Sequence, residues 1–256
     1  MNEFKLSKRL ACVAGIINPG GVLADIGTDH GYLPVHVAKN NIASKVIAMD
    51  VRKKPLEKAA ENIKLYGVSQ KVELRLSDGL YKLAENEADT ITICGMGGKL
   101  IQSILENGSS KISENTQLIL SPQSEIREFR KYLSESGYET VKEYMISEDG
   151  QFYVIIDCRR NGYKNELICT GETEKEVYYR YGKELLKGKN KSLREYLLRE
   201  LRISQGVRNK LENIDNDKIL GAYAVVLMED GTKHLEVMNI KQIKQSWSQG
   251  YGYKEN

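Results

Sequence analysis

Aspartate and glycine residues follow three apolar segments in the first part of the chain, where they could bind a polar ligand. Asp25 begins a turn that contains Gly27 and Gly31, Asp50 lies 25 residues further on, and Asp78 follows a third apolar run. Glycine lets the backbone turn tightly and approach a ligand closely. An acidic residue at about this spacing reaches ribose hydroxyls in dinucleotide folds. Together these residues predict a nucleoside site, although each alone is also typical of an ordinary turn or helix cap.

The first turn differs from a pyrophosphate-binding loop. Such a loop has the pattern GxGxxG, whereas the turn Gly27-Thr28-Asp29-His30-Gly31 lacks its second and third glycines. Asp29 also places negative charge where a pyrophosphate would lie. The turn therefore suits a ligand without phosphates, such as one with an amino acid tail and a sulfonium.

The elements that must position these residues alternate along the chain as far as residue 136. Strands are predicted at 22–25, 45–50, 72–77, 90–94 and 117–120, and helices at 32–39, 54–66 and 125–136. A further apolar helix, with Leu100, Ile101, Ile104 and Leu105, is predicted after the fourth strand. This alternation predicts a Rossmann-like α/β fold with a mostly parallel sheet and helices on both faces. Ligands bind such sheets at the carboxyl ends of the strands. Two extended runs joined by Asp149-Gly150 then predict a final antiparallel hairpin.

The motif from Leu23 to Pro34, LADIGTDHGYLP, together with Asp50 and Asp78-Gly79, resembles class I methyltransferases that use S-adenosylmethionine. Four more motifs make the chain similar to the TrmK family of bacterial tRNA (adenine(22)-N1)-methyltransferases. They are Leu6-Ser7-Lys8-Arg9-Leu10, Cys94-Gly95-Met96-Gly97-Gly98, Ser121-Pro122-Gln123 and Tyr179-Arg180-Tyr181-Gly182. The resemblance covers roughly residues 5–213. It implies methyl transfer from S-adenosylmethionine to N1 of adenine 22 in tRNA, with S-adenosylhomocysteine as the product and no metal.

The resemblance also implies a role for each residue of the cofactor site. The cofactor loop would consist of Asp25, Gly27, Thr28 and Gly31, and Asp50 would hold the ribose. The adenine would face Asp78 and Gly79, with Val51 and Leu80 as apolar neighbours. The reactive methyl group would lie beside Gly95, Met96 and Gly97.

Asp29 is the candidate catalytic residue. Adenine N1 has an in-plane lone pair and needs no prior deprotonation, so the enzyme mainly has to position N1 in line with the methyl group. The chain has no Asn/Asp-Pro-Pro-Tyr motif of the kind found in methylases of exocyclic nitrogens. A carboxylate near the adenine could stabilise the positive charge that develops or accept a proton from N6. The alternative for Asp29 is a loop-capping residue.

N1 lies on the Watson–Crick edge, so the target adenine must be unpaired or extruded from its stack. Candidate contacts to tRNA in this part of the chain are Lys5, Lys8 and Arg9 on a predicted N-terminal helix, His30 and Tyr32 in the first turn, and Gly98. The basic residues could bind phosphates, or they could form a solvated helix face. His30 could equally be a structural histidine, and Tyr32 a core aromatic residue.

Positive charge is concentrated in one segment. The formal net charge of the 256 residues is +3, but residues 1–158 carry −2, residues 159–213 carry +6 and residues 214–256 carry −1. Helices predicted at 172–186 and 191–211 carry most of these basic residues, and Lys187, Lys191 and Arg194 are the candidate contacts to tRNA there. We therefore expect a catalytic domain over 1–160 and a basic helical, coiled-coil-like domain over 161–256.

The tail and the composition leave several points open. Residues 223–240 have the pattern of a hairpin, whereas the family pattern would place a long helix near them.

The four cysteines are scattered without CxxC spacing, which disfavours a zinc site and predicts a reducing, cytoplasmic environment. No apolar run is long enough to span a membrane, no signal peptide is predicted, and a monomer is favoured. The alternative functions are methylation of a small molecule or protein, and non-catalytic RNA binding.

Overall fold

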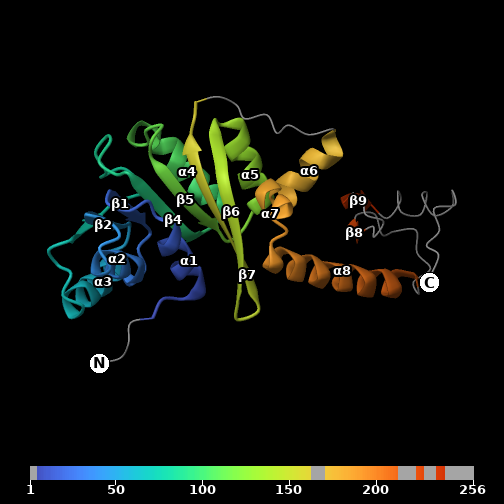
Figure 1. Cartoon of the computed structure of the whole chain (residues 1–256), viewed down its shortest axis with the longest axis horizontal. Helices are drawn as coiled ribbons and strands as arrows, with labels where there is room; N and C mark the ends of the chain where they lie inside the picture. The colour runs from blue at the N-terminus through green and yellow to red at the C-terminus, as the bar shows by residue number, and fades with distance from the viewer. Residues whose placement is uncertain (1–4, 163–170, 213–222, 228–234, 240–256) are drawn as a thin grey trace. The chain divides into compact units, whose positions relative to one another are not determined.

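A seven-stranded sheet organises the first part of the chain (Figure 1). The computed structural model describes residues 5–162, 171–212, 223–227 and 235–239. The strands are β1 (Val22–Ile26), β2 (Lys45–Asp50), β3 (Val72–Leu76), β4 (Thr90–Met96), β5 (Gln117–Pro122), β6 (Tyr138–Glu148) and β7 (Gln151–Arg160). Their order is β3-β2-β1-β4-β5-β7-β6, and only the contacts of β7 with β5 and β6 are antiparallel. The predicted Rossmann-like sheet with an antiparallel final hairpin is confirmed.

The direction of the chain places helices on both faces of this sheet. The helices are α1 (Lys8–Ile16), α2 (Tyr32–Lys39), α3 (Lys53–Leu65), α4 (Gly98–Asn107), the short η1 (Ser109–Lys111) and α5 (Ile126–Glu135). From β1 the chain moves outward to β3 through α2 and α3, and from β4 it moves the opposite way through α4 and α5. Since such crossovers are right-handed, the two pairs of helices lie on opposite faces.

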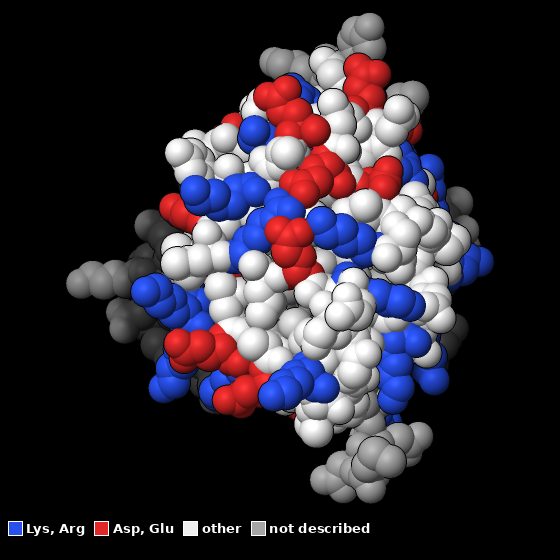
Figure 2. Space-filling model, turned by 90° about the vertical axis from the view of Figure 1, so that its left-hand side faces the viewer, with Lys and Arg blue, Asp and Glu red and all other residues white. Residues whose placement is uncertain are grey.

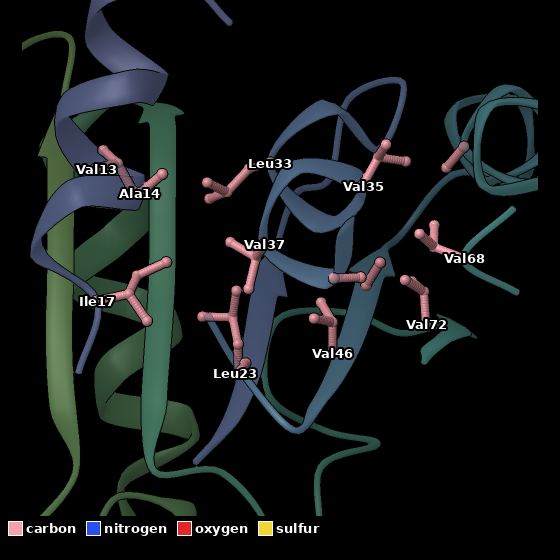
Figure 3. Close-up of a cluster of buried hydrophobic side chains, with 14 of the residues drawn as sticks. Val13, Ala14, Ile17, Leu23, Leu33, Val35, Val37, Val46, Val68 and Val72 are labelled. Atoms are coloured by element: carbon pink, nitrogen blue, oxygen red, sulfur yellow. The ribbon is translucent and has the colours of Figure 1, made fainter. Parts of the chain in front are cut away.

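A hydrophobic core joins α1, α2 and α3 to one face of the sheet (Figure 3). Val13 and Ile17 of α1, Leu33 and Val37 of α2 and Val46 of β2 are among its buried residues. Their apolar area, removed from water, is the main stabilising contribution at this face, at about 25 cal/mol per Å². The core therefore holds α1 and the first two strands as one framework, from which the loops at the strand ends project.

The second compact unit, Ile168–Asn256, follows the first, Met1–Leu167. It contains α6 (Glu172–Tyr181), α7 (Lys183–Lys187), α8 (Lys191–Glu212), β8 (Tyr223–Leu227) and β9 (Leu235–Asn239). The prediction of one continuous helix over 172–186 is wrong. Gly182 has a φ of +86°, which interrupts the helix between α6 and α7, because glycine reaches positive φ at little cost.

The tail contains a hairpin rather than the long helix that the family pattern would place there. β8 and β9 pair antiparallel, from Tyr223 opposite Asn239 to Leu227 opposite Leu235. The hairpin interpretation of this segment is therefore confirmed for the two strands. Residues 213–222, the connection 228–234 and residues 240–256 lie outside the described residues, as do 163–170 in the predicted linker.

Candidate active site

The carboxyl ends of four parallel strands bring the predicted cofactor residues to one edge of the sheet. In the paired strands Asp25 of β1 lies opposite Ala48 of β2 and Thr92 of β4. Asp50, the last residue of β2, lies opposite Leu76, the last residue of β3. The loops that follow these strands therefore start side by side, as expected for a ligand site of an open α/β sheet.

Asp25 is a buried carboxylate at the centre of this edge. The hydroxyl of Thr92 donates a hydrogen bond to its Oδ1 at 2.7 Å. Burial raises the pKa of Asp25, the hydrogen bond from Thr92 and the nearby hydroxyl group of Thr28 act in the opposite direction, and the nearby charge of Asp50 raises the pKa further. Thr92 was not predicted as a site residue. Its signal in the sequence is a polar side chain within the otherwise apolar run 90–94.

The turn after β1 is fixed to the end of the neighbouring strand. The backbone N–H groups of Gly27 and Thr28 both donate to the carbonyl of Met49, at 2.8 and 2.9 Å. Gly27 has a φ of +76°, and a Cβ there would lie 2.1 Å from the methyl group of Met96. Met96 therefore lies directly against the glycine of the predicted cofactor loop.

Gly31 closes this turn and begins α2. It has a φ of +67°, and a Cβ at this position would lie only 3.0 Å from the Cβ of Ala59 in α3. The structure thus gives Gly31 a packing role where α2 approaches α3. Contact with a cofactor is not needed to explain why glycine stands there.

The ends of β2 and β3 carry the residues predicted for the ribose and the adenine. Asp50 is buried, and its Oδ1 accepts a hydrogen bond from the backbone N–H of Arg52 at 2.8 Å. Val51 beside it is 60% exposed, so its side chain is accessible to a ligand at this edge. Asp78 is exposed, whereas Leu80 is only 2% exposed and lies against Gly108. Of the two apolar neighbours predicted, Val51 is the accessible one.

The glycine turn after β4 lies against the loop after β5. The N–H of Gly98, the first residue of α4, donates to the carbonyl of Ser124 at 3.1 Å. A Cβ on Gly98 would lie 2.8 Å from that carbonyl oxygen, and one on Gly97 would lie 2.9 Å from the hydroxyl of Ser124. Gly98 is therefore needed for this close approach of two backbones, whereas Gly97 lies against a side chain. Gly95, with a φ of +84°, precedes them.

Asp29, His30 and Tyr32 lie together at the mouth of the first turn. The carboxylate of Asp29 is 76% exposed, and its Oδ1 lies 3.4 Å from Nε2 of His30. The rings of His30 and Tyr32 are stacked, with centroids 5.5 Å apart and an interplanar angle of 6°. The carbonyl of His30 accepts a hydrogen bond from the Asn62 side chain of α3, which holds the turn. Tyr32 is exposed, so its interpretation as a core aromatic residue is wrong.

The three basic residues near the N-terminus have different environments. Lys5 and Lys8 are exposed. Arg9 is turned inward, with its guanidinium 5.1 Å from the ring centroid of Tyr153 in β7. The interpretation of all three as one solvated basic face is therefore wrong for Arg9. No local pattern indicated its inward position, because Tyr153 lies 144 residues away in the sequence.

The basic residues predicted in the second unit lie around the turn between α7 and α8. Lys187, Lys191 and Arg194 are all exposed. Nζ of Lys187 lies 3.6 Å from a carboxylate oxygen of Glu184. Figure 2 shows the left-hand side of Figure 1, with elements of the first unit, where both basic and acidic side chains lie among uncharged residues.

The described residues form neither a metal site nor a membrane-spanning helix. Among them there is no group of three or more His, Cys, Asp and Glu side chains that could hold a metal ion. None of the helices in this part of the chain is both long enough and apolar enough to span a membrane.

Comparisons with known proteins agree with this geometry. A family profile described as "Methyltransferase domain" matches residues 6–156. A second, described as "RecT family", matches residues 150–256, less than half of the chain. The tRNA (adenine(22)-N(1))-methyltransferase of Bacillus subtilis is 41% identical over 156 residues, which are 61% of this chain and 66% of that protein. The crystal structure of the B. subtilis m1A22 tRNA methyltransferase TrmK aligns with a TM-score of 0.70 and 32% identity, covering 84% of this chain and 92% of that one.

This chain belongs to the TrmK family. A structure of TrmK from M. capricolum in complex with S-adenosylhomocysteine, its natural cofactor product, aligns with a TM-score of 0.69 and 31% identity, over 83% of this chain and 90% of that one. The TrmK likeness therefore extends beyond the methyltransferase domain that the first profile matches.

Proposed function

We propose that this protein transfers the methyl group of S-adenosylmethionine to N1 of adenine 22 in tRNA. The observation that carries the proposal is the 41% identity with the B. subtilis enzyme of that specificity. The row of strand-end residues described above supports it, because it offers a nucleoside site without a phosphate-binding loop. The proposed target is that of the B. subtilis enzyme, and the proposed product is the compound bound in the M. capricolum structure.

The residues at the strand ends fit a cationic cofactor. Asp25 and Asp50 are both buried, and the charge of Asp50 raises the pKa of Asp25. A ligand that carries positive charge beside them offsets this repulsion. Asp50 would bind the ribose, Asp78 and Gly79 would face the adenine with Val51 against its ring, and Gly27 and Thr28 would line the loop. S-adenosylmethionine, when bound, supplies a methyl group activated by its sulfonium.

Asp29, His30 and Tyr32 would receive the target adenine. The stacked rings of half-buried His30 and exposed Tyr32 form an aromatic surface of the kind on which an extruded base stacks. Asp29 is the exposed carboxylate nearest to that surface along the chain, and its negative charge would stabilise the positive charge that forms on the methylated ring. Because N1 already has a lone pair, these residues act by orientation and electrostatics rather than by removing a proton before attack.

The second unit would bind the body of the tRNA. Its exposed basic residues around the α7–α8 turn, Lys187, Lys191 and Arg194, support this part of the proposal, because phosphate contacts from such residues carry most of the affinity for nucleic acid. A two-domain division near residue 160, action as a monomer and a cytoplasmic location are parts of the same proposal.

Methyl transfer from labelled S-adenosylmethionine tests the proposal. Unmodified tRNA should take up label, and its nuclease digest should contain 1-methyladenosine. A tRNA with guanosine in place of adenine 22 should take up none. Asp50→Ala should weaken binding of S-adenosylhomocysteine without weakening tRNA binding, since Asp50 would contact only the cofactor. Absence of label in tRNA while the protein binds the cofactor would refute the proposed substrate.

A further inference from the structure

Arg9 carries an unsatisfied donor beside the candidate active site. Its Nη1 atom is buried and has no hydrogen-bond partner among the described residues. An arginine guanidinium is always charged and only donates hydrogen bonds, and a buried donor without an acceptor destabilises the fold. The unpaired donor of Arg9 is explained if a hydrogen-bond acceptor binds beside Nη1.

Contacts with two strands, and the cap of its own helix, hold Arg9 in this position. The side chain of Glu148, at the end of β6, accepts hydrogen bonds from the backbone N–H groups of Lys8 and Arg9 at 2.5 and 3.4 Å. Ser7 caps the same helix end by accepting from the N–H of Leu10. The ring of Tyr153 in β7 lies under the guanidinium. The first turn of α1 is thus tied to the β6–β7 hairpin, and the Arg9 side chain is directed by these contacts.

The guanidinium faces the end of β4. A Cβ placed on Gly95 would lie 3.4 Å from Nη1 of Arg9 and 3.6 Å from the side-chain amide nitrogen of Gln123. These are ordinary van der Waals distances, so Arg9 and Gln123 border the space above Gly95 without filling the position of that Cβ. The positive charge of Arg9 is also close enough to lower the pKa of the half-buried Cys94 thiol, against the larger opposing effect of desolvation.

We infer that Arg9 binds an oxyanion above Gly95, at the carboxyl end of β4. This inference rests on the proposed function. A carboxylate or phosphate oxygen satisfies a guanidinium by charge and by hydrogen bonding, whereas the methylated adenine is cationic and is repelled by it. Two oxyanions enter this site, the carboxylate of the cofactor's amino acid tail and a phosphate of the target nucleotide.

The strand order relates the first of these to Arg9. Adenine at β3 and ribose at β2 would direct the rest of the cofactor toward β1 and then β4, the next strands in the sheet. The amino acid tail would therefore extend toward Gly95 and Arg9. The nucleotide phosphate is the other source, because the acceptor adenine must approach the same strand end.

Calorimetry with two relatives of the cofactor distinguishes the carboxylate from the phosphate. S-adenosylhomocysteine carries the carboxylate, whereas methylthioadenosine has the same nucleoside and sulfur without the amino acid tail. Arg9→Met, which removes the charge and keeps a similar length, should weaken S-adenosylhomocysteine binding at least about tenfold and leave methylthioadenosine binding within about twofold if the carboxylate is bound. If the phosphate is bound, both ligands should bind as in wild type, and tRNA affinity should fall with a salt slope about 0.7–0.9 smaller.

Two further variants control these measurements. Lys64→Met removes one exposed positive charge from α3, outside the candidate site, and should change none of the affinities. Arg9→Lys keeps the charge without the planar fork, should restore part of the lost affinity, and serves in place of Arg9→Met if thermal unfolding shows that the latter is not folded. Unchanged affinity for both S-adenosylhomocysteine and tRNA in a folded Arg9 variant would overturn the inference. Wild-type protein that binds the cofactor but does not methylate tRNA would instead refute the proposed function.

Discussion

The exposure of Asp29 distinguishes it from the other acidic residues of the candidate site. Asp25 and Asp50 are buried at strand ends, whereas Asp29 lies at the mouth of the turn beside the stacked rings of His30 and Tyr32. An exposed carboxylate at that point can interact with an incoming base without holding the cofactor. The buried pair and the exposed residue should therefore affect different kinetic constants.

Asp29→Ala tests this division. We expect kcat to fall by about tenfold to a thousandfold, the range in which one electrostatic group contributes to a transition state. The affinity for S-adenosylhomocysteine should stay within a few-fold of wild type. Steady-state kinetics and calorimetry give the two quantities. Asp29→Asn is the matched variant that keeps size and hydrogen bonding but removes the charge, and a rate as high as that of wild type in both variants would remove Asp29 from the mechanism.

Residues next to strands were easier to predict than residues brought together by distant segments. Asp25, Asp50 and Asp78 follow apolar runs, and parallel strands must end at a common edge, so their proximity follows from local patterns. The position of Arg9 depends on Glu148 and Tyr153, which are far away in the sequence. A basic residue on a predicted amphipathic helix has no local signal that distinguishes an inward guanidinium from a solvated one.

Elements were predicted to within a residue or two where propensity and packing agree. The helix predicted at 54–66 is Lys53–Leu65, and the strand predicted at 45–50 has those bounds in the structure. The break at Gly182 was missed because helical residues continue on both sides of it. A glycine after Tyr179-Arg180-Tyr181 was the available signal, since helices commonly end at glycine. The tail strands were ambiguous because the family pattern and the local Gly231 turn pointed to different structures.

The edge strand β3 carries an ion-pair network that should make folding sensitive to acid. Arg75 bonds to Glu87 through both Nη atoms, at 2.6 and 2.7 Å, and to Glu73 through Nε at 2.6 Å. Hydrogen bonds from Arg75 lower the pKa of both glutamates to about 2, and Lys45 contributes to the shift of Glu73. Such charged groups on an edge strand also oppose pairing with another chain.

Arg75→Met tests the network by its pH dependence. The two glutamates have pKa values below their unfolded value of 4.5, so the pairs stabilise the fold above that pH and are lost as the pH falls toward 2. We expect wild type to exceed Arg75→Met in free energy of unfolding by about 1 kcal/mol at pH 7, a modest value because Glu73 is exposed. Urea unfolding between pH 7 and 3 should show this difference shrinking. A difference that is independent of pH would contradict the network's role, and Lys131→Met, which removes one exposed ion pair, should show little effect.

At the scale of the whole molecule, the distribution of charge is more informative than its sum. The net charge of +3 combines −2 over residues 1–158, +6 over 159–213 and −1 over 214–256. The first contains the strand ends where we propose that a cationic cofactor binds, and the second contains exposed basic residues around the α7–α8 turn. Binding of RNA and methyl transfer should therefore be separable by mutation.

Reversal of charge at Lys187, Lys191 and Arg194 tests this separation. If each contacts a phosphate, replacing all three with glutamate should lower tRNA affinity by at least about tenfold and reduce the slope of log affinity against log salt by about 2–3. Binding of S-adenosylhomocysteine should be unchanged, because the cofactor residues lie in the other unit. Filter binding at several salt concentrations provides the measurement. The same reversal at Lys58, Lys64 and Lys131, three exposed lysines of the first unit, is the matched control for net charge. If that control lowers the salt slope equally, the affinity depends on overall charge and not on a binding surface in the second unit.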